Sequence, residues 1–275
     1  MVSIEREESE PFLLAYQHIS GFMLSTYVEM IGVIIKDKVE YNTTIASLNL
    51  LVLVVIVKHI AIMDKYDPEK KVDLLLDEWG TWFDVEPGAN PGHLYQQNSM
   101  RDAMVAALSL NIFHKYTERL KMTNIAQIAN VLQSMVLTRG DKMVLTPTYH
   151  VFRMYNVHQD ALYLPSACDA EKFTDGNGRQ CPYVDATASR NAEGAIHVTL
   201  TNVSLDEAAT VTIDLAGNAK PRITGEILTA ETIQAHNDFD RPDEVKPVEF
   251  KDFKVKDGKI VVKMPAKSIA GLSIL

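Results

Sequence analysis

The sequence predicts an α/β region followed by an all-β region, and three observations carry this prediction. In residues 46–157, apolar runs of strand length alternate with segments of helical periodicity, which is the order of a β/α barrel or a doubly wound sheet. In residues 158–275 the pattern changes to short runs of alternating apolar and polar residues with turn signals between them. One turn contains Asp257 and Gly258, a pair that favours a two-residue hairpin. The second region is therefore predicted to be an antiparallel β-sandwich.

The first 45 residues predict no regular element. The opening MVSIEREESE is acidic and has no apolar core, so it lacks the pattern of a secretory signal. The residues that follow mix apolar and polar types without a sustained helical or strand period. We therefore treat residues 1–45 as a segment of their own.

The α/β region opens with a predicted helix and a predicted strand. Residues 46–66 are apolar on most sides and predict one buried helix. Their apolar run, Leu50–Val57, is much shorter than the roughly 20 residues that a membrane span needs. The run Val72–Trp79 predicts a strand buried on both faces, as in a parallel sheet covered by helices.

The rest of the α/β region predicts a loop and two more helices. Glycine and proline recur in residues 80–97 and predict the loop. Apolar residues at helical spacing then begin after Asn98 and Ser99, either of which is a suitable N-cap. A short apolar segment follows, and a last helix is predicted at Tyr149–Tyr155.

The all-β region is predicted from six segments with strand-like alternation. They are YVDATASRN, AIHVTLTNVS, AATVTIDLAG, RITGEILTA, DFKVKDGKIVVKMP and SIAGLSIL, between residues 183 and 275.

Composition excludes some classes of function. The chain has 275 residues and a net charge of −9, which argues against a nucleic-acid partner because such proteins need a basic surface. Its two cysteines, Cys168 and Cys181, are too few for a disulfide framework, and the eight histidines show no metal-ligand spacing. We therefore expect no metal, no organic cofactor and no membrane partner.

The chemically informative stretch is the end of the predicted strand. Asp77 and Glu78 follow the apolar run and are joined by Trp79 and Trp82, the only two tryptophans of the chain. Because neighbouring strand residues point to opposite faces, only one of the two carboxylates is expected to face a barrel axis. A carboxylate beside aromatic rings is suited to a sugar ring, whose anomeric carbon the carboxylate attacks while the aromatic rings pack on its C–H face. The alternative is a solvated charge pair at a strand-to-loop junction.

Four segments together resemble the α-L-arabinofuranosidases of glycoside hydrolase family 51. They are LLLDEWGTWFDVEPG, LYQQNSMRDAMVAALSLNIF, MTNIAQIANVLQSM and VLTPTYHVFRMY. The resemblance covers residues 58–160 closely. It continues more loosely to residue 275 through AHNDFDRPDEVKP and PAKSIAGLSIL.

The resemblance implies the C-terminal part of a (β/α)8 barrel followed by an antiparallel β-sandwich. It implies a retaining hydrolase that releases terminal α-L-arabinofuranosyl residues from arabinan- or arabinoxylan-type glycans. By the family motif, Glu78 is the nucleophile, Gln127 binds the sugar ring and Trp79 shapes the pocket wall. Tyr149 and His150 are expected to support a helix start rather than to act on substrate. The family also implies a homo-oligomer for the intact protein.

One part of the family pattern is missing from this sequence. The general acid/base of the family is the glutamate of an Asn-Glu pair, and the chain contains no Asn-Glu dipeptide. We therefore expect a fragment with domains at residues 46–157 and 158–275, and residues 1–45 fit a frameshifted or misassembled start. Such a fragment would be nearly inactive, because general acid catalysis contributes about 10²–10⁴-fold. The start carries no export signal, so the default compartment is the cytoplasm. The alternative function is a non-catalytic carbohydrate-binding or structural β-sandwich module with a barrel remnant.

Overall fold

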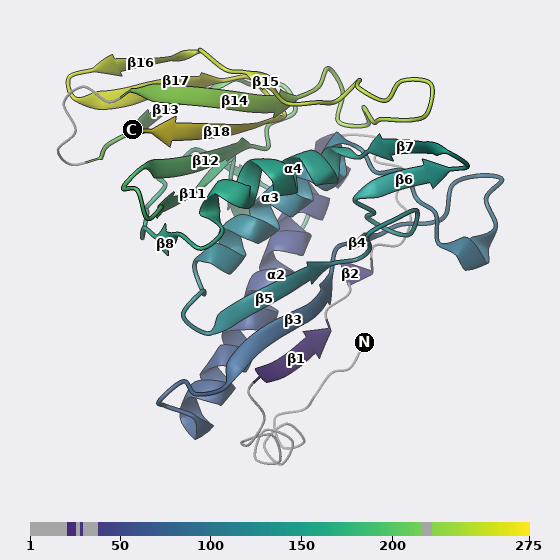
Figure 1. Ribbon diagram of the computed structural model, residues 1–275, viewed down its shortest axis with the longest axis horizontal. Helices are drawn as coiled ribbons and strands as arrows, with labels where there is room; N and C mark the ends of the chain where they lie inside the picture. The colour runs from purple at the N-terminus through teal and green to yellow at the C-terminus, as the bar shows by residue number, and fades with distance from the viewer. Residues whose placement is uncertain (1–20, 26–27, 30–37, 216–221) are drawn as a thin grey trace.

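Figure 1 shows the computed structural model, which describes residues 21–25, 28–29, 38–215 and 222–275. The described residues among 1–45 form strands at Gly21–Ser25 and Val28–Glu29 and the start of a helix at Lys38, so the expectation of no regular element is wrong there. The rest of that expectation falls outside the described residues. No helix in the part described is long and apolar enough to cross a lipid bilayer.

Three parallel strands form the first sheet, in the order β1-β3-β5. Their bounds are Gly21–Ser25 for β1, Asp73–Trp79 for β3 and Leu120–Ile125 for β5. The prediction of a parallel strand at Val72–Trp79 is confirmed. The prediction that both of its faces are buried is wrong for the part of the chain that is described. Leu74 and Leu76 are buried under helices, whereas alternate positions on the other face are only half-buried or exposed.

Among the residues that the structure describes, three α-helices accompany this sheet, and Figure 1 shows their arrangement. They are α2 at Lys38–Tyr66, α3 at Met100–His114 and α4 at Pro147–Tyr155, with short 3₁₀ turns η1 at Pro91–His93 and η2 at Asn156–His158. All three predicted helices are present. Helix α3 begins where the sequence places it, because Ser99 and Asp102 form a reciprocal capping box.

The two larger antiparallel sheets of the all-β region face each other. The larger has the order β15-β14-β18-β12-β11-β8 and the smaller β13-β17-β16. Their bounds are Leu162–Tyr163 (β8), Val184–Arg190 (β11), Ile196–Asn202 (β12), Ala209–Ile213 (β13), Ile223–Thr229 (β14), Val248–Glu249 (β15), Phe253–Lys256 (β16), Lys259–Met264 (β17) and Ser268–Ile274 (β18). Apolar residues of β12, β14, β17 and β18 form one buried cluster between the sheets. The hairpin at Asp257-Gly258 is confirmed, with both residues at positive φ between β16 and β17.

Six shorter strands complete the described chain. They are Val28–Glu29 (β2), Thr81–Trp82 (β4), Val136–Arg139 (β6), Lys142–Leu145 (β7), Lys172–Thr174 (β9) and Gln180–Pro182 (β10), of which β4 interrupts the predicted loop. Strands β6 and β7 pair as a hairpin that the sequence analysis does not anticipate.

Helices α3 and α4 lie between the parallel sheet and the sandwich (Figure 1). A second buried cluster joins Leu74 and Leu76 of β3 to α3, α4 and the outer face of the larger antiparallel sheet. The two regions therefore share one continuous core, which fixes the end of β3 relative to the sandwich.

Candidate active site

Strand β3 carries a β-bulge at the predicted pair of carboxylates. On one side Leu24 pairs with Leu76 and Ser25 with Glu78, so Asp77 has no partner of its own. On the other side the register also shifts between Leu76 and Trp79. An extra residue of this kind changes which way the following side chains point.

The bulge decides which face Glu78 occupies. The core cluster under the helices contains Leu74, Leu76 and Trp79. Leu76 and Trp79 are three residues apart and still share this face, whereas regular alternation would require a spacing of two. Because Glu78 directly precedes Trp79 in the strand, it points to the opposite face, away from the helices. Its side chain is half-buried, whereas Asp77 is exposed. Glu78 is therefore the more enclosed carboxylate at the open face of the sheet.

Trp79 does not lie where the sequence analysis places it. Its ring is 1% exposed and packs on the helix side of β3, edge-on to Phe113 at 5.0 Å and stacked on Phe152 at 5.9 Å between ring centroids. The ring therefore supports the strand end from below. The prediction that it forms an accessible pocket wall is corrected by this burial.

The more accessible tryptophan is Trp82, to which the family resemblance assigns no role. Its neighbours Thr81 and Phe83 are buried and both face α3, where Thr81 bonds to Asp102 and Phe83 lies under the guanidinium of Arg101. By strand alternation the half-buried ring of Trp82 faces the other way.

Gln127 lies beyond the end of β5, at the same edge of the sheet as Glu78. The amide of Ala126 donates to the Trp79 carbonyl at 2.8 Å, and the Gln127 carbonyl accepts from the Met135 amide at 3.1 Å. The peptide bond between Ala126 and Gln127 is cis. The Gln127 side chain is exposed. Since β3 and β5 are parallel neighbours, their carboxyl ends meet. The last paired residues are Trp79 and Ile125; Glu78 directly precedes the first, and Gln127 lies two residues after the second.

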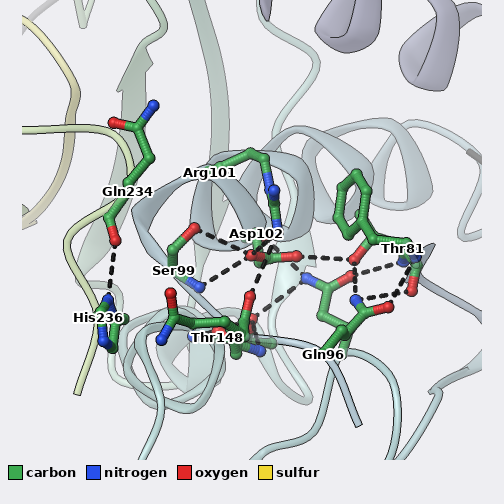
Figure 2. Close-up of polar contacts among 12 residues, drawn as sticks. Thr81, Gln96, Ser99, Arg101, Asp102, Thr148, Gln234 and His236 are labelled. Atoms are coloured by element: carbon green, nitrogen blue, oxygen red, sulfur yellow. Dashed lines mark hydrogen bonds and ion pairs between the residues drawn. The ribbon is translucent and has the colours of Figure 1, made fainter. Parts of the chain in front are cut away.

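A buried polar network lies beneath these strand ends, and Figure 2 shows most of it. The Asp102 carboxylate accepts from the Thr81 hydroxyl at 2.7 Å, the Ser99 amide at 2.8 Å and Arg101 Nη2 at 3.0 Å. Gln96 donates to Thr81 Oγ1 at 3.1 Å and accepts from the Phe83 amide at 2.7 Å. The bonds of Thr81 and Phe83 join the segment after Glu78 to helix α3 and its N-terminal loop, so the network fixes that segment.

Tyr149 and His150 occupy the first turn of α4, as expected of supporting residues. His150 is buried, and both of its ring nitrogens lack a hydrogen-bond partner. Burial, with the positive charge of Arg153 nearby, lowers the pKa of His150 to about 4. The ring is therefore neutral near pH 7.

The described residues contain neither a metal site nor a disulfide. No group of three or more His, Cys, Asp or Glu side chains is arranged there to hold a metal ion. Cys168 and Cys181 are both free thiols, and burial raises the pKa of each.

Residues 77–268 match the family described as the α-L-arabinofuranosidase C-terminal domain. The chain is 57% identical over 220 residues to an intracellular exo-α-L-arabinofuranosidase of Bacteroides ovatus, an alignment that covers 80% of this chain and 43% of that protein. The structure is similar to the GH51 arabinofuranosidase of Xanthomonas axonopodis pv. citri with a TM-score of 0.92 and 40% identity, covering 98% of this chain and 56% of that one.

An arabinose complex of a Thermotoga maritima α-L-arabinofuranosidase shares the fold, with a TM-score of 0.77 and 20% identity over 97% of this chain and 56% of that chain. The chain thus spans about half the length of the proteins it matches.

Proposed function

We propose that this chain, which belongs to the glycoside hydrolase family 51 α-L-arabinofuranosidases through their C-terminal domain family, carries the nucleophile of a retaining arabinofuranosidase. The substrates would be terminal α-L-arabinofuranosyl residues of arabinan- or arabinoxylan-type glycans. The single observation that supports this assignment most is the bulge in β3, which turns Glu78 away from the helices.

The proposed chemistry proceeds in two steps. An oxygen of Glu78 bonds to the anomeric carbon while the bond to the leaving oxygen breaks and its electron pair departs with that oxygen. A second carboxyl group, about 5 Å away in retaining enzymes, protonates the leaving oxygen and later activates the water that hydrolyses the glycosyl-enzyme. We assign this second carboxyl to the part of the relatives that the chain does not span, since the sequence has no Asn-Glu pair.

Gln127 and Trp82 would bind the sugar ring. The Gln127 amide is exposed at the same strand edge as Glu78 and can both donate to and accept from ring hydroxyls. The ring of Trp82 faces away from α3 and would pack on the C–H face of the furanose. Trp79, which is buried, would act by holding the strand end.

The surrounding architecture is proposed to be part of a (β/α)8 barrel at residues 46–157, followed by the sandwich at 158–275. Parallel sheets are normally covered on both faces, and the β1-β3-β5 sheet has its described helices on one. An intracellular location is supported by the name of the Bacteroides ovatus relative. Assembly as a homo-oligomer remains part of the proposal for the intact protein.

Trapping of the glycosyl-enzyme tests the proposed nucleophile. A dinitrophenyl α-L-arabinofuranoside has a leaving group that needs no protonation, so the first step does not require the missing general acid. The second step does require a general base, and the intermediate should therefore accumulate. Intact-mass spectrometry and peptide mapping should find one arabinosyl group on Glu78.

Two variants complete this experiment. Asp77→Asn should be labelled like the wild type, because Asp77 lies in the bulge without a strand partner. Glu78→Gln should not be labelled. Labelling of Glu78→Gln, or a wild-type chain that stays unlabelled, would contradict the assignment.

A second candidate function is carbohydrate binding by the sandwich, and a groove favours it. The groove has a volume of about 780 Å³ and lies between β11, β12, the edge of β13 and residues 164–171. Titration of the Glu78→Gln variant with arabinoxylan oligosaccharides should then give binding that Thr212→Trp, a substitution in the groove, abolishes.

A further inference from the structure

Gln133 is a fully buried amide in the loop between β5 and β6, and every polar atom of its side chain has a partner. Its Oε1 accepts from the Thr81 amide at 2.9 Å. Its Nε2 donates to the Asp102 carbonyl at 2.8 Å and to Thr148 Oγ1 at 3.2 Å. One side chain thus joins the segment after Glu78 to the first turns of both α3 and α4.

The backbone of Gln133 also joins the two strand ends. Its amide donates to the Ala126 carbonyl at 3.0 Å, and the Ala126 amide donates to the Trp79 carbonyl at 2.8 Å. Together with the bond from Thr81, these contacts close a ring around Gly80. Gln133 therefore holds the residues that follow Glu78 and the residue that precedes Gln127.

The fit around Gly80 leaves little freedom. A Cβ placed on Gly80 would lie 3.3 Å from both the Ala126 carbonyl oxygen and Gln133 Oε1, and Gly80 has a φ of +149° that side chains rarely adopt. The backbone directly after Glu78 is thus enclosed by Ala126 on one side and by the Gln133 amide on the other.

We infer that Gln133 is a positioning residue, which sets the separation of the nucleophile Glu78 from the sugar-binding Gln127. This inference rests on the proposed function. A nucleophile must approach its target carbon within about 3–3.5 Å, and a misplacement of about 1 Å can cost roughly 10²-fold in rate. Glu78 itself lies on a bulge, which lacks regular pairing, so its position depends on contacts outside the strand.

The alternative is that Gln133 only satisfies buried polar groups and has no effect on the position of Glu78. The stability and the Glu78 labelling rate of Gln133→Leu distinguish this structural role from a positioning role. Asn202 supplies a matched control, since its amide is also fully buried and bonds to the Glu207 and Pro265 carbonyls of the sandwich, far along the chain from Glu78. Both Gln133→Leu and Asn202→Leu should lower the urea midpoint. Only Gln133→Leu should slow the labelling of Glu78 by dinitrophenyl arabinofuranoside, by about 10²-fold.

Gln133→Glu provides a pH signature. A protonated glutamic acid can accept from Thr81 and donate to the Asp102 carbonyl, whereas the carboxylate can only accept. The labelling rate of Gln133→Glu, divided by that of the wild type, should therefore rise as the pH falls, and that of Gln133→Leu should not. Wild-type labelling rates in Gln133→Leu would overturn the inference.

A wild-type chain that is not labelled would count against the proposed function alone. In that case hydrogen exchange of backbone amides still tests the positioning role of Gln133. Gln133→Leu should speed exchange at the Thr81 and Gln133 amides relative to amides of β12, and Asn202→Leu should not. Unchanged protection at both sites in Gln133→Leu would overturn the positioning role.

Discussion

The hydroxyl of Thr81 donates to the carboxylate of Asp102 over 2.7 Å, and both side chains are at most 2% exposed. Thr81 follows Glu78 by three residues, and Asp102 lies in the first turn of α3. This bond therefore connects the proposed nucleophile's strand to a helix N-terminus, where a negative charge is favourable. Asp102 therefore both caps α3 and holds the segment that follows Glu78.

Removal of the Asp102 carboxylate should be strongly destabilising. Asp102→Ala leaves the Thr81 hydroxyl, the Ser99 amide and the partly buried Arg101 side chain without their shared acceptor. Breaking a buried charge pair in this way costs about 3–5 kcal/mol. Urea unfolding followed by tryptophan fluorescence measures the loss, and Asp102→Asn, which keeps one acceptor oxygen, should lose less. A loss below about 1 kcal/mol for Asp102→Ala would show that the network contributes little.

Local elements of the fold are predictable from the sequence because short-range chemistry specifies them. Ser99 and Asp102 cap α3, and Asp257-Gly258 turns the last hairpin, and both signals lie within a few adjacent residues. The hairpin of β6 and β7 escapes prediction because its residues lack a clear alternation, although its buried Leu137 and Val144 pair with each other.

The candidate site is predictable only in part. Family motifs point to Glu78 and Gln127, but the direction of each side chain depends on the bulge in β3. A bulge is a register shift between strands distant in sequence, so strict alternation from Leu74 assigns Trp79 to the wrong face. The contacts of Gln133 likewise span several elements and leave no local pattern.

Arg119 should be the main anchor between α2 and the parallel sheet. Its guanidinium is 2% exposed and bonds to Asp64 at 2.7 Å, to Asp67 at 2.6 Å and to the Val72 carbonyl at 2.7 Å. Arg119→Met should destabilise the chain by about 3 kcal/mol, because it removes a buried charge and leaves the half-buried Asp67 carboxylate without its partner. The measurement is the free energy of unfolding in urea at pH 7.

Lys70→Met is the matched control for this prediction. Lys70 pairs with Glu118 at the surface, where such an ion pair contributes about 0–1 kcal/mol. Equal losses for Arg119→Met and Lys70→Met would contradict the anchoring role of Arg119.

Gly225 in β14 should not tolerate a methyl group. An added Cβ would lie 2.9 Å from the Phe250 carbonyl oxygen, 3.0 Å from Leu272 Cδ2 and 3.1 Å from Phe253 Cε1. Gly225→Ala should therefore cost about 1–3 kcal/mol through overpacking of the sandwich core. Thermal unfolding should show a lower midpoint. Gly271→Ala is the control, since its nearest atoms, in Glu226 and Met154, are 3.8 and 3.9 Å away, and a similar loss there would point to backbone effects instead.

Acid should weaken the contact between the helices and the sandwich through two histidines. Burial, with His114 and His197 nearby, lowers the pKa of His158 to about 3, and burial lowers that of His114 to about 4. His158 lies between the Ser189 hydroxyl at 2.7 Å and the Thr199 hydroxyl at 2.8 Å. Both rings are therefore neutral in the folded chain at pH 5, whereas in the unfolded chain they titrate near pH 6.5.

The sign of the effect follows from proton uptake. Between about pH 6.5 and pH 4 the unfolded chain binds more protons than the folded chain, so stability falls as the pH falls. Each histidine should cost about 2 kcal/mol between pH 7 and pH 5. Urea unfolding at the two pH values measures this loss. His158→Gln should be less stable at pH 7 but should lose about 2 kcal/mol less on acidification, while the exposed His93→Gln should behave like the wild type. Equal pH slopes for His158→Gln and the wild type would mean that His158 does not carry the acid sensitivity of this interface.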